Sequence, residues 1–158
     1  MYKQVLIPLD GSPLAEQALP HAIAQAVHSG AELVLLRVVV PFTHVTGVSL
    51  ANLGEINQQA LSWAHEYLES IAASVRERGI SVQVAVTEGQ SHTEITQFAE
   101  ENQIDLIVLS TRGRSGFSRW LMGSVADRVV RGATIPVLLV RVREDRGQAE
   151  ITTATPRE

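Results

Sequence analysis

Five short apolar runs alternate with segments whose apolar residues recur every three or four positions, and this alternation strongly constrains the fold. Continuous apolar runs of this length are typical of strands buried on both faces, whereas the three-to-four spacing is typical of helices. The runs lie at residues 3–9, 31–40, 80–89, 104–110 and 135–142. The alternation predicts a single α/β domain, Rossmann-like, with an open parallel sheet and helices on both faces.

The segment after the first run has helical spacing and a clear start. Ser12 can cap the helix, and Pro13 suits its first position, where the missing N–H is not needed. Pro20 lies inside the pattern and should kink the helix, because proline cannot donate to the preceding turn. Gly30 then ends it.

Three more helices are predicted, at residues 55–78, 91–103 and 124–132. Residues 41–54 carry turn residues without a clean period, so we expect a mobile connection there. The domain should cover residues 1–143, and the polar tail at 144–158 should be disordered because it has little to bury.

The composition limits which cellular compartment and which kinds of site we expect. The chain has no cysteine, which excludes a disulfide framework and a thiolate metal site. No run approaches the roughly 18 apolar residues of a membrane span, and no secretory signal precedes the first strand, so we expect a cytoplasmic protein.

Charge is unevenly distributed along the chain. The formal net charge is −4, but residues 110–146 hold eight arginines and three acids, a net of +5. A positive region on an acidic body suits a local anionic ligand better than a long nucleic acid. Taken singly, any of these arginines could equally be a solvated surface or interface residue.

The stretch "STRGRSGFSRWLMGSVADRVV", residues 110–130, follows directly on the fourth apolar run. Open parallel sheets bind ligands beyond the carboxyl ends of their strands, where this stretch begins. Gly113 permits a turn that brings backbone amides close to a ligand, and Gly123-Ser124 starts a helix whose free N–H groups favour phosphate. The alternative is that Gly113 is a simple turn and Ser124 a simple helix cap.

Other familiar site chemistries are absent from the sequence. The only lysine is Lys3, so the chain has no Walker P-loop, and no G-x-G-x-x-G follows the first strand. It has neither a G-x-S-x-G nucleophile elbow nor a zinc-binding histidine pair. Asp10 is the one acid at a strand end of the predicted site; it could accept from a ribose or a base, hold a phosphate-bound Mg²⁺, or cap the first helix.

The segments "VLIPLDGSPLAEQAL" and "STRGRSGFSRWLMGSVADRVVRGATIPVLLV" resemble the universal stress protein family. Nucleotide-binding members carry G-x-x-G, nine residues, then G-[ST]; here Gly113 and Gly123-Ser124 match, while Ser110 replaces the first glycine. The resemblance covers roughly residues 1–142. It implies the strand order 3-2-1-4-5, bound ATP with Mg²⁺ held through the phosphates, and a homodimer formed through residues 135–142.

The resemblance also implies a set of nucleotide-binding residues. Those expected around the adenine and ribose are Pro8, Asp10 and Val38. Those expected along the ribose and phosphates are Leu109, Ser110, Arg112, Gly113, Gly123, Ser124 and Val125. No catalytic residue and no direct metal ligand is implied, with Asp10 the only side chain considered for Mg²⁺.

Three functions remain open at this point. The first is an ATP-binding stress-response regulator with little or no turnover, because the sequence offers a phosphate motif without an obvious base or nucleophile. The second is a slow ATPase or phosphotransferase using Asp10, Arg112 or Arg114, and Ser124. The third is a member that binds no nucleotide and acts through protein contacts, which the change at Ser110 leaves open.

Overall fold

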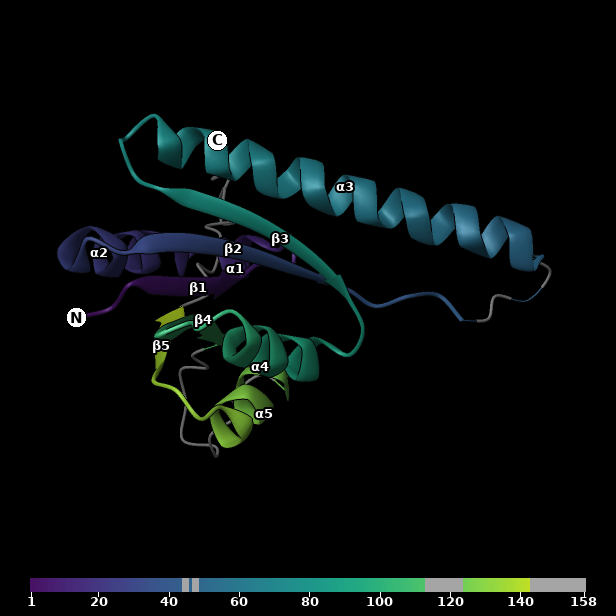
Figure 1. Ribbon diagram of the computed structural model, residues 1–158. Helices are drawn as coiled ribbons and strands as arrows, with labels where there is room; N and C mark the ends of the chain where they lie inside the picture. The colour runs from purple at the N-terminus through teal and green to yellow at the C-terminus, as the bar shows by residue number, and fades with distance from the viewer. Residues whose placement is uncertain (44–45, 47–48, 113–123, 143–158) are drawn as a thin grey trace, which may run out of the picture.

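A computed structural model describes residues 1–43, 46, 49–112 and 124–142 (Figure 1). Its centre is a five-stranded sheet in the order β3-β2-β1-β4-β5, with every neighbouring pair parallel, as predicted. The strands are β1 (Gln4–Pro8), β2 (Glu32–Val39), β3 (Val82–Glu88), β4 (Leu106–Arg112) and β5 (Val137–Val142).

Helices cover both faces of this sheet. They are α1 (Pro13–Glu16), α2 (Leu19–Ser29), α3 (Leu50–Arg76), α4 (Ser91–Glu101) and α5 (Ser124–Gly132). The first three pack on one face and the last two on the other, which Figure 1 shows with α3 above the sheet and α4 and α5 below it. No described helix is both long enough and apolar enough to cross a membrane.

The central strands are apolar throughout because each face is covered. On β1, Val5 and Ile7 face the α2 and α3 side, whereas Leu6 faces the α4 and α5 side, and all three are fully buried. The same alternation along β2 and β4 divides the interior into two hydrophobic clusters. Side-chain alternation about a parallel sheet accounts for the unbroken apolar runs of the sequence.

The first helical segment, predicted as one helix kinked at Pro20, is divided into two helices, α1 and α2. The break falls at Gln17 and Ala18, and Pro20 occupies the first turn of α2, where its missing N–H is tolerated. Ser12 caps α1 as predicted, its Oγ accepting from the Ala15 N–H at 3.1 Å. Gly30 ends α2 in the left-handed conformation, at φ 65°.

The connection between β2 and α3 is shorter than the predicted segment 41–54. Ser49 caps the helix through its Oγ, which accepts from the Asn52 N–H at 3.3 Å, and the helix begins at Leu50. Residues 50–54 are therefore helical, which corrects the sequence prediction for that part. The expected disordered tail, 144–158, lies outside the described residues.

Candidate nucleotide site at the β1–β4 switch point

The strand order reverses at β1, which lies between β2 and β4. Ladder pairing between β1 and β4 covers only Val5 with Leu106 and Leu6 with Ile107. β1 pairs with β2 along its whole length, from Gln4 to Pro8, and the Leu9 N–H continues this pairing by donating to the carbonyl of Leu36 at 2.8 Å. The sheet thus separates at its carboxyl edge between β1 and β4, the position at which open α/β sheets bind ligands.

Asp10 lies directly after β1 and organises the turn into α1. Its Oδ1 accepts from the Ser12 N–H at 2.9 Å, while Ser12 itself provides the helix cap. Gly11 between them has φ 82°, a left-handed conformation that favours glycine. The carboxyl group of Asp10 is exposed, so one oxygen shapes the turn while the group still faces solvent at the strand end.

Three predicted nucleotide residues lie on one face of the sheet. Val38 and Leu109 belong to the hydrophobic cluster under α4 and α5, and Pro8 follows Leu6 in the alternation that faces this side. Pro8 and Val38 are half-buried at the strand ends, but Leu109 is only 6% exposed. Any contact that Leu109 makes with a ligand must therefore come mainly from its backbone.

Ser110, in place of the family glycine, lies on the opposite face. Alternation along β4 groups Ser110 with Leu106 and Val108, which pack toward α2 and α3. Its hydroxyl therefore points away from the face of the sheet that carries Val38 and Leu109. Arg112 ends β4, while the motif glycines, Gly113 and Gly123, lie outside the described residues.

The first turn of α5 reaches the same side as these strand ends. Ser124 and Val125 are the first two helical residues, and both are exposed. Ala126 and Val129, one turn along, anchor the helix in the cluster that also holds Val38 and Leu109. Free N–H groups and the positive dipole end at a helix N-terminus suit an anion in general.

No group of three metal-binding side chains occurs within the described residues. Among the described residues at the switch point, the acidic side chain is that of Asp10, already engaged by the Ser12 N–H. Mg²⁺ prefers one or two carboxylates together with substrate phosphates and water. This donor set fits a magnesium ion that arrives with a phosphate ligand better than one held by the protein itself.

Sequence reasoning missed a series of side-chain contacts that lies behind the Asp10 turn. The Arg37 guanidinium lies over the Tyr67 ring, 5.4 Å from its centroid, and against Gly11. The Tyr67 hydroxyl in turn donates to Glu16 of α1 at 2.9 Å. Burial, and then this hydrogen bond, raise the pKa of Tyr67 above its ordinary value. These contacts join β2, α3 and α1, and their sequence separation hid them.

Thr87 is a second residue that no sequence pattern singles out. It is the register partner of Val38, at the end of β3. Its hydroxyl oxygen is buried and has no hydrogen-bond partner among the described residues. Burying a hydroxyl without a hydrogen-bond partner costs folding free energy. Thr87 therefore carries an unpaired polar atom beside a strand end of the candidate site.

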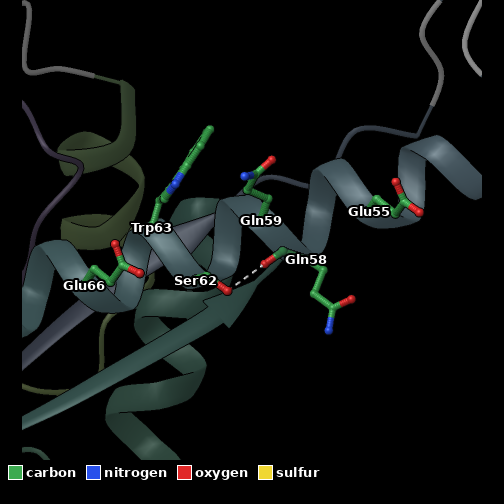
Figure 2. A pocket seen from close by; sticks show the side chains of 6 residues that line it. All are labelled: Glu55, Gln58, Gln59, Ser62, Trp63 and Glu66. Atoms are coloured by element: carbon green, nitrogen blue, oxygen red, sulfur yellow. Dashed lines mark hydrogen bonds between the residues drawn. The ribbon is translucent and has the colours of Figure 1, made fainter.

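The outer face of α3 carries a shallow depression of about 470 Å³, lined by Glu55, Gln58, Gln59, Ser62, Trp63 and Glu66 (Figure 2). Figure 2 shows that all six side chains come from this one helix. With no opposing wall, the depression is a helix surface bearing two acids and an exposed tryptophan. None of its lining residues is among those predicted to bind nucleotide.

Comparison with known proteins agrees with this architecture. The sequence model of the universal stress protein family matches residues 1–141. The universal stress protein MJ0531 of Methanocaldococcus jannaschii is 35% identical over 89% of this chain and 83% of its own length. The solved structure of MJ0577, a universal stress protein of the same organism, superposes with a TM-score of 0.77 at 29% identity, covering 91% of this chain and 99% of that one.

The match therefore reaches every element described above, from β1 to Arg141 in β5. It includes the reversed strand order, the Asp10 turn and the start of α5. The chain belongs to the universal stress protein family.

Proposed function

We propose that the protein binds an adenine nucleotide, ATP with Mg²⁺ in the first place, and acts as a dimeric regulator with little or no turnover. One observation carries the proposal. Backbone pairing between β1 and β4 stops at Leu6 and Ile107, and the first turn of α5 lies on the same side as the strand ends beyond. Such a crevice, with a helix N-terminus beside it, is suited to a nucleotide phosphate.

The base and ribose are assigned to the β1 and β2 ends. Pro8 and Val38 offer half-buried apolar surface on one face, and the exposed Asp10 carboxylate can accept from ribose hydroxyls. Because Oδ1 already accepts from the Ser12 N–H, the carboxylate is held in place before the ligand arrives. Preorganisation of this kind lowers the entropic cost of binding.

The phosphates are assigned to Ser110, Arg112, Gly113, Gly123 and the first turn of α5, following the family motif. Ser110 retains the backbone amide of the glycine it replaces, and its side chain is directed to the opposite face. The substitution therefore need not obstruct the nucleotide side. Arg112 adds positive charge at the end of β4.

Two structural relatives were solved with adenine nucleotides bound. One is a universal stress protein solved in complex with cAMP, which superposes with a TM-score of 0.64 at 23% identity. The other, from Archaeoglobus fulgidus, was solved in complex with dAMP and superposes with a TM-score of 0.57 at 21% identity. At these identities they support the fold, and their ligands suggest which compounds to test first.

The site chemistry favours binding over turnover. Asp10 is the acid at the switch point, and its engagement in the turn disfavours a role as general base. Fast phosphoryl transfer needs positioned metal ligands and a group that orients the nucleophile. A regulator that changes its surface on binding ATP requires neither.

Gly113→Val tests the site. A branched side chain at the proposed phosphate turn should abolish ATP binding measured by isothermal titration calorimetry, while the circular dichroism spectrum remains that of the parent. Gly54→Val is the matched control, because a Cβ at Gly54 meets no atom within 4 Å. Unchanged ATP affinity in Gly113→Val would refute the site.

Native mass spectrometry and a single-turnover assay separate the remaining functions. Bound ATP or ADP in the freshly purified protein supports a nucleotide-binding member. With protein in excess over ATP, the regulator should release almost no ADP over hours, whereas a slow ATPase would convert the bound nucleotide. The absence of any binding to ATP, ADP, AMP or cAMP would leave protein contacts as the function.

A further inference from the structure

We propose that the hollow between the end of β2 and the middle of α3 is a second ligand site, for a small organic monoanion with an apolar body. The hollow measures about 440 Å³, within the usual size range of small-molecule sites. Its lining residues are Arg37, Val38, Val39, Val40, Ala60, Trp63, Ala64 and Tyr67.

The hollow results from a mismatch between side chains of β2 and α3. Along β2, Leu33 and Leu35 fill the face under α3 and are fully buried, but the next residue of that row is Arg37, which is only half-buried. On α3 the facing residues are Ala60 and Ala64, which are too small to fill the space. A mainly apolar, half-open hollow remains, with Arg37 as the cation among its described lining residues.

The Arg37 guanidinium is held in place there. It lies over the Tyr67 ring and against Gly11, so its position is fixed by cation–π contact and by packing. Among the described residues no carboxylate comes within 4.0 Å of it, and the neighbouring Glu16 accepts from Tyr67 instead. The acids that face this cluster are Glu16 and Asp10. The guanidinium therefore retains donors for a ligand carboxylate.

Trp63 forms the outer wall and indicates an apolar ligand body. Its side chain is 62% exposed, and in Figure 2 the indole projects away from α3. Covering exposed indole and valine surface with an apolar group is favourable. Trp63 also lines the adjoining depression on α3, which holds Glu55 and Glu66. With Glu16 and Asp10 already facing the Arg37 cluster, these acids disfavour a ligand with more than one negative charge.

The hollow lies on the opposite face of the sheet from the proposed nucleotide site. Arg37 continues the β2 row of Leu33 and Leu35, whereas the side chain of Val38 packs in the cluster under α4 and α5. Val38, at the edge, belongs to the linings of both. Asp10 faces the Arg37 and Tyr67 cluster from the nucleotide side, so the two sites are adjacent but have different main walls.

Decanoate is the test probe, with decanol and decyltrimethylammonium as neutral and cationic molecules of equal chain length. The experiments use a Trp120→Phe background, so that Trp63 is the single tryptophan of the chain. Decanoate should shift the Trp63 emission saturably and decanol more weakly, whereas the cation should not saturate. If decanoate gives no saturable change, or the cation saturates at equal concentration, the proposal fails.

Arg37→Gln should weaken decanoate binding by about tenfold, the usual size of a lost charge-assisted hydrogen bond, and decanol binding by less than about threefold. Arg76→Gln is the matched control: this arginine is at the far end of α3, paired with Glu69 at 2.7 Å. It should bind decanoate like the parent. Equal losses in Arg37→Gln and Arg76→Gln would overturn the assignment.

Ala60→Met provides a second variant that does not touch the charge. A longer side chain should fill the hollow and weaken decanoate and decanol alike, so the test remains decisive if Arg37→Gln does not fold. Finally, saturating ATP with Mg²⁺ should leave decanoate affinity unchanged. Competitive displacement by ATP would show that the hollow is part of the nucleotide site and would overturn its separate identity.

Discussion

Asp10 combines a structural and a proposed binding role in one carboxyl group. One oxygen accepts from the Ser12 N–H and fixes the β1–α1 turn. From the sequence, helix capping, ribose binding and metal binding were all open for this residue. The structure identifies Ser12 as the cap of α1, which leaves Asp10 as the residue that shapes the turn and faces solvent.

Asp10→Asn should therefore separate the two roles. Asparagine can keep the turn, so the free energy of unfolding without ligand should change by less than about 0.5 kcal/mol. ATP affinity, measured by calorimetry, should fall by about tenfold because a charge-assisted bond to the ribose is weakened. The affinity for 2′,3′-dideoxy-ATP should be the same in both proteins. A loss seen only when Mg²⁺ is present would instead make Asp10 a metal ligand.

Asp105 is a purely structural carboxylate at the other end of the sheet. Its Oδ2 accepts from the backbone N–H groups of Lys3, at 2.6 Å, and Gln4, at 3.0 Å, and so ties β1 to the start of β4. The hydrogen bond from the Lys3 N–H, followed by that from Gln4, lowers the pKa of Asp105. A lowered folded-state pKa contributes stability above the unfolded pKa, near 3.9, which is lost as the pH falls.

Asp105→Asn should lower the free energy of unfolding at pH 7 by about 1 kcal/mol, because two charge-assisted bonds become neutral ones. Urea unfolding across pH 2–7 should show this difference shrinking as the pH falls below about 4, where the parent carboxylate is protonated. Glu101→Gln on α4, where the side chain is exposed, is the control. A difference that is independent of pH would contradict the assignment.

At the level of elements, the apolar pattern predicted each described strand and the alternation of strands with helices, but it gave α1 and α2 as one kinked helix. It could predict the strands because strands buried on both faces must be apolar throughout. The helix boundaries were harder to predict from the sequence. Gly54 weakened the helical pattern before Glu55, so the Ser49 cap and the start at Leu50 were missed. Arg37, Tyr67 and Glu16 meet only through tertiary packing, which local spacing cannot reveal.

Tyr67→Phe tests how strongly this packing joins α3 to α1. The ring remains for Arg37, but the hydrogen bond to Glu16 is lost, so unfolding free energy at pH 7 should fall by about 1 kcal/mol. Because the folded pKa of Tyr67 is raised, the stabilisation persists below its ordinary pKa, near 10, and declines above it. Tyr2→Phe, without a hydroxyl contact among the described residues, should be neutral. Equal losses in the two variants would refute the link.

At the scale of the whole molecule, the sheet has two edges, β3 and β5. Edge strands expose unpaired N–H and C=O groups that favour pairing with another chain. Along β5, the carbonyl of Pro136 accepts from the Ile107 N–H, so in a parallel ladder Leu138 and Val140 also face β4. The backbone groups of Val137, Leu139 and Arg141 consequently point outward, where a second copy would pair.

Arg141→Pro tests the proposed dimer directly. The side chain of Arg141 is exposed and its N–H points away from β4, so proline should remove an outward donor while the β4–β5 ladder persists. Sedimentation velocity should show the parent as a dimer and Arg141→Pro as predominantly monomer. Arg141→Ala, which keeps the N–H and loses only the charge, should remain dimeric. A dimeric Arg141→Pro protein would locate the interface elsewhere. A monomeric Arg141→Ala protein would assign the interface contact to the arginine side chain. Only backbone pairing at this edge predicts a monomer for Arg141→Pro and a dimer for Arg141→Ala.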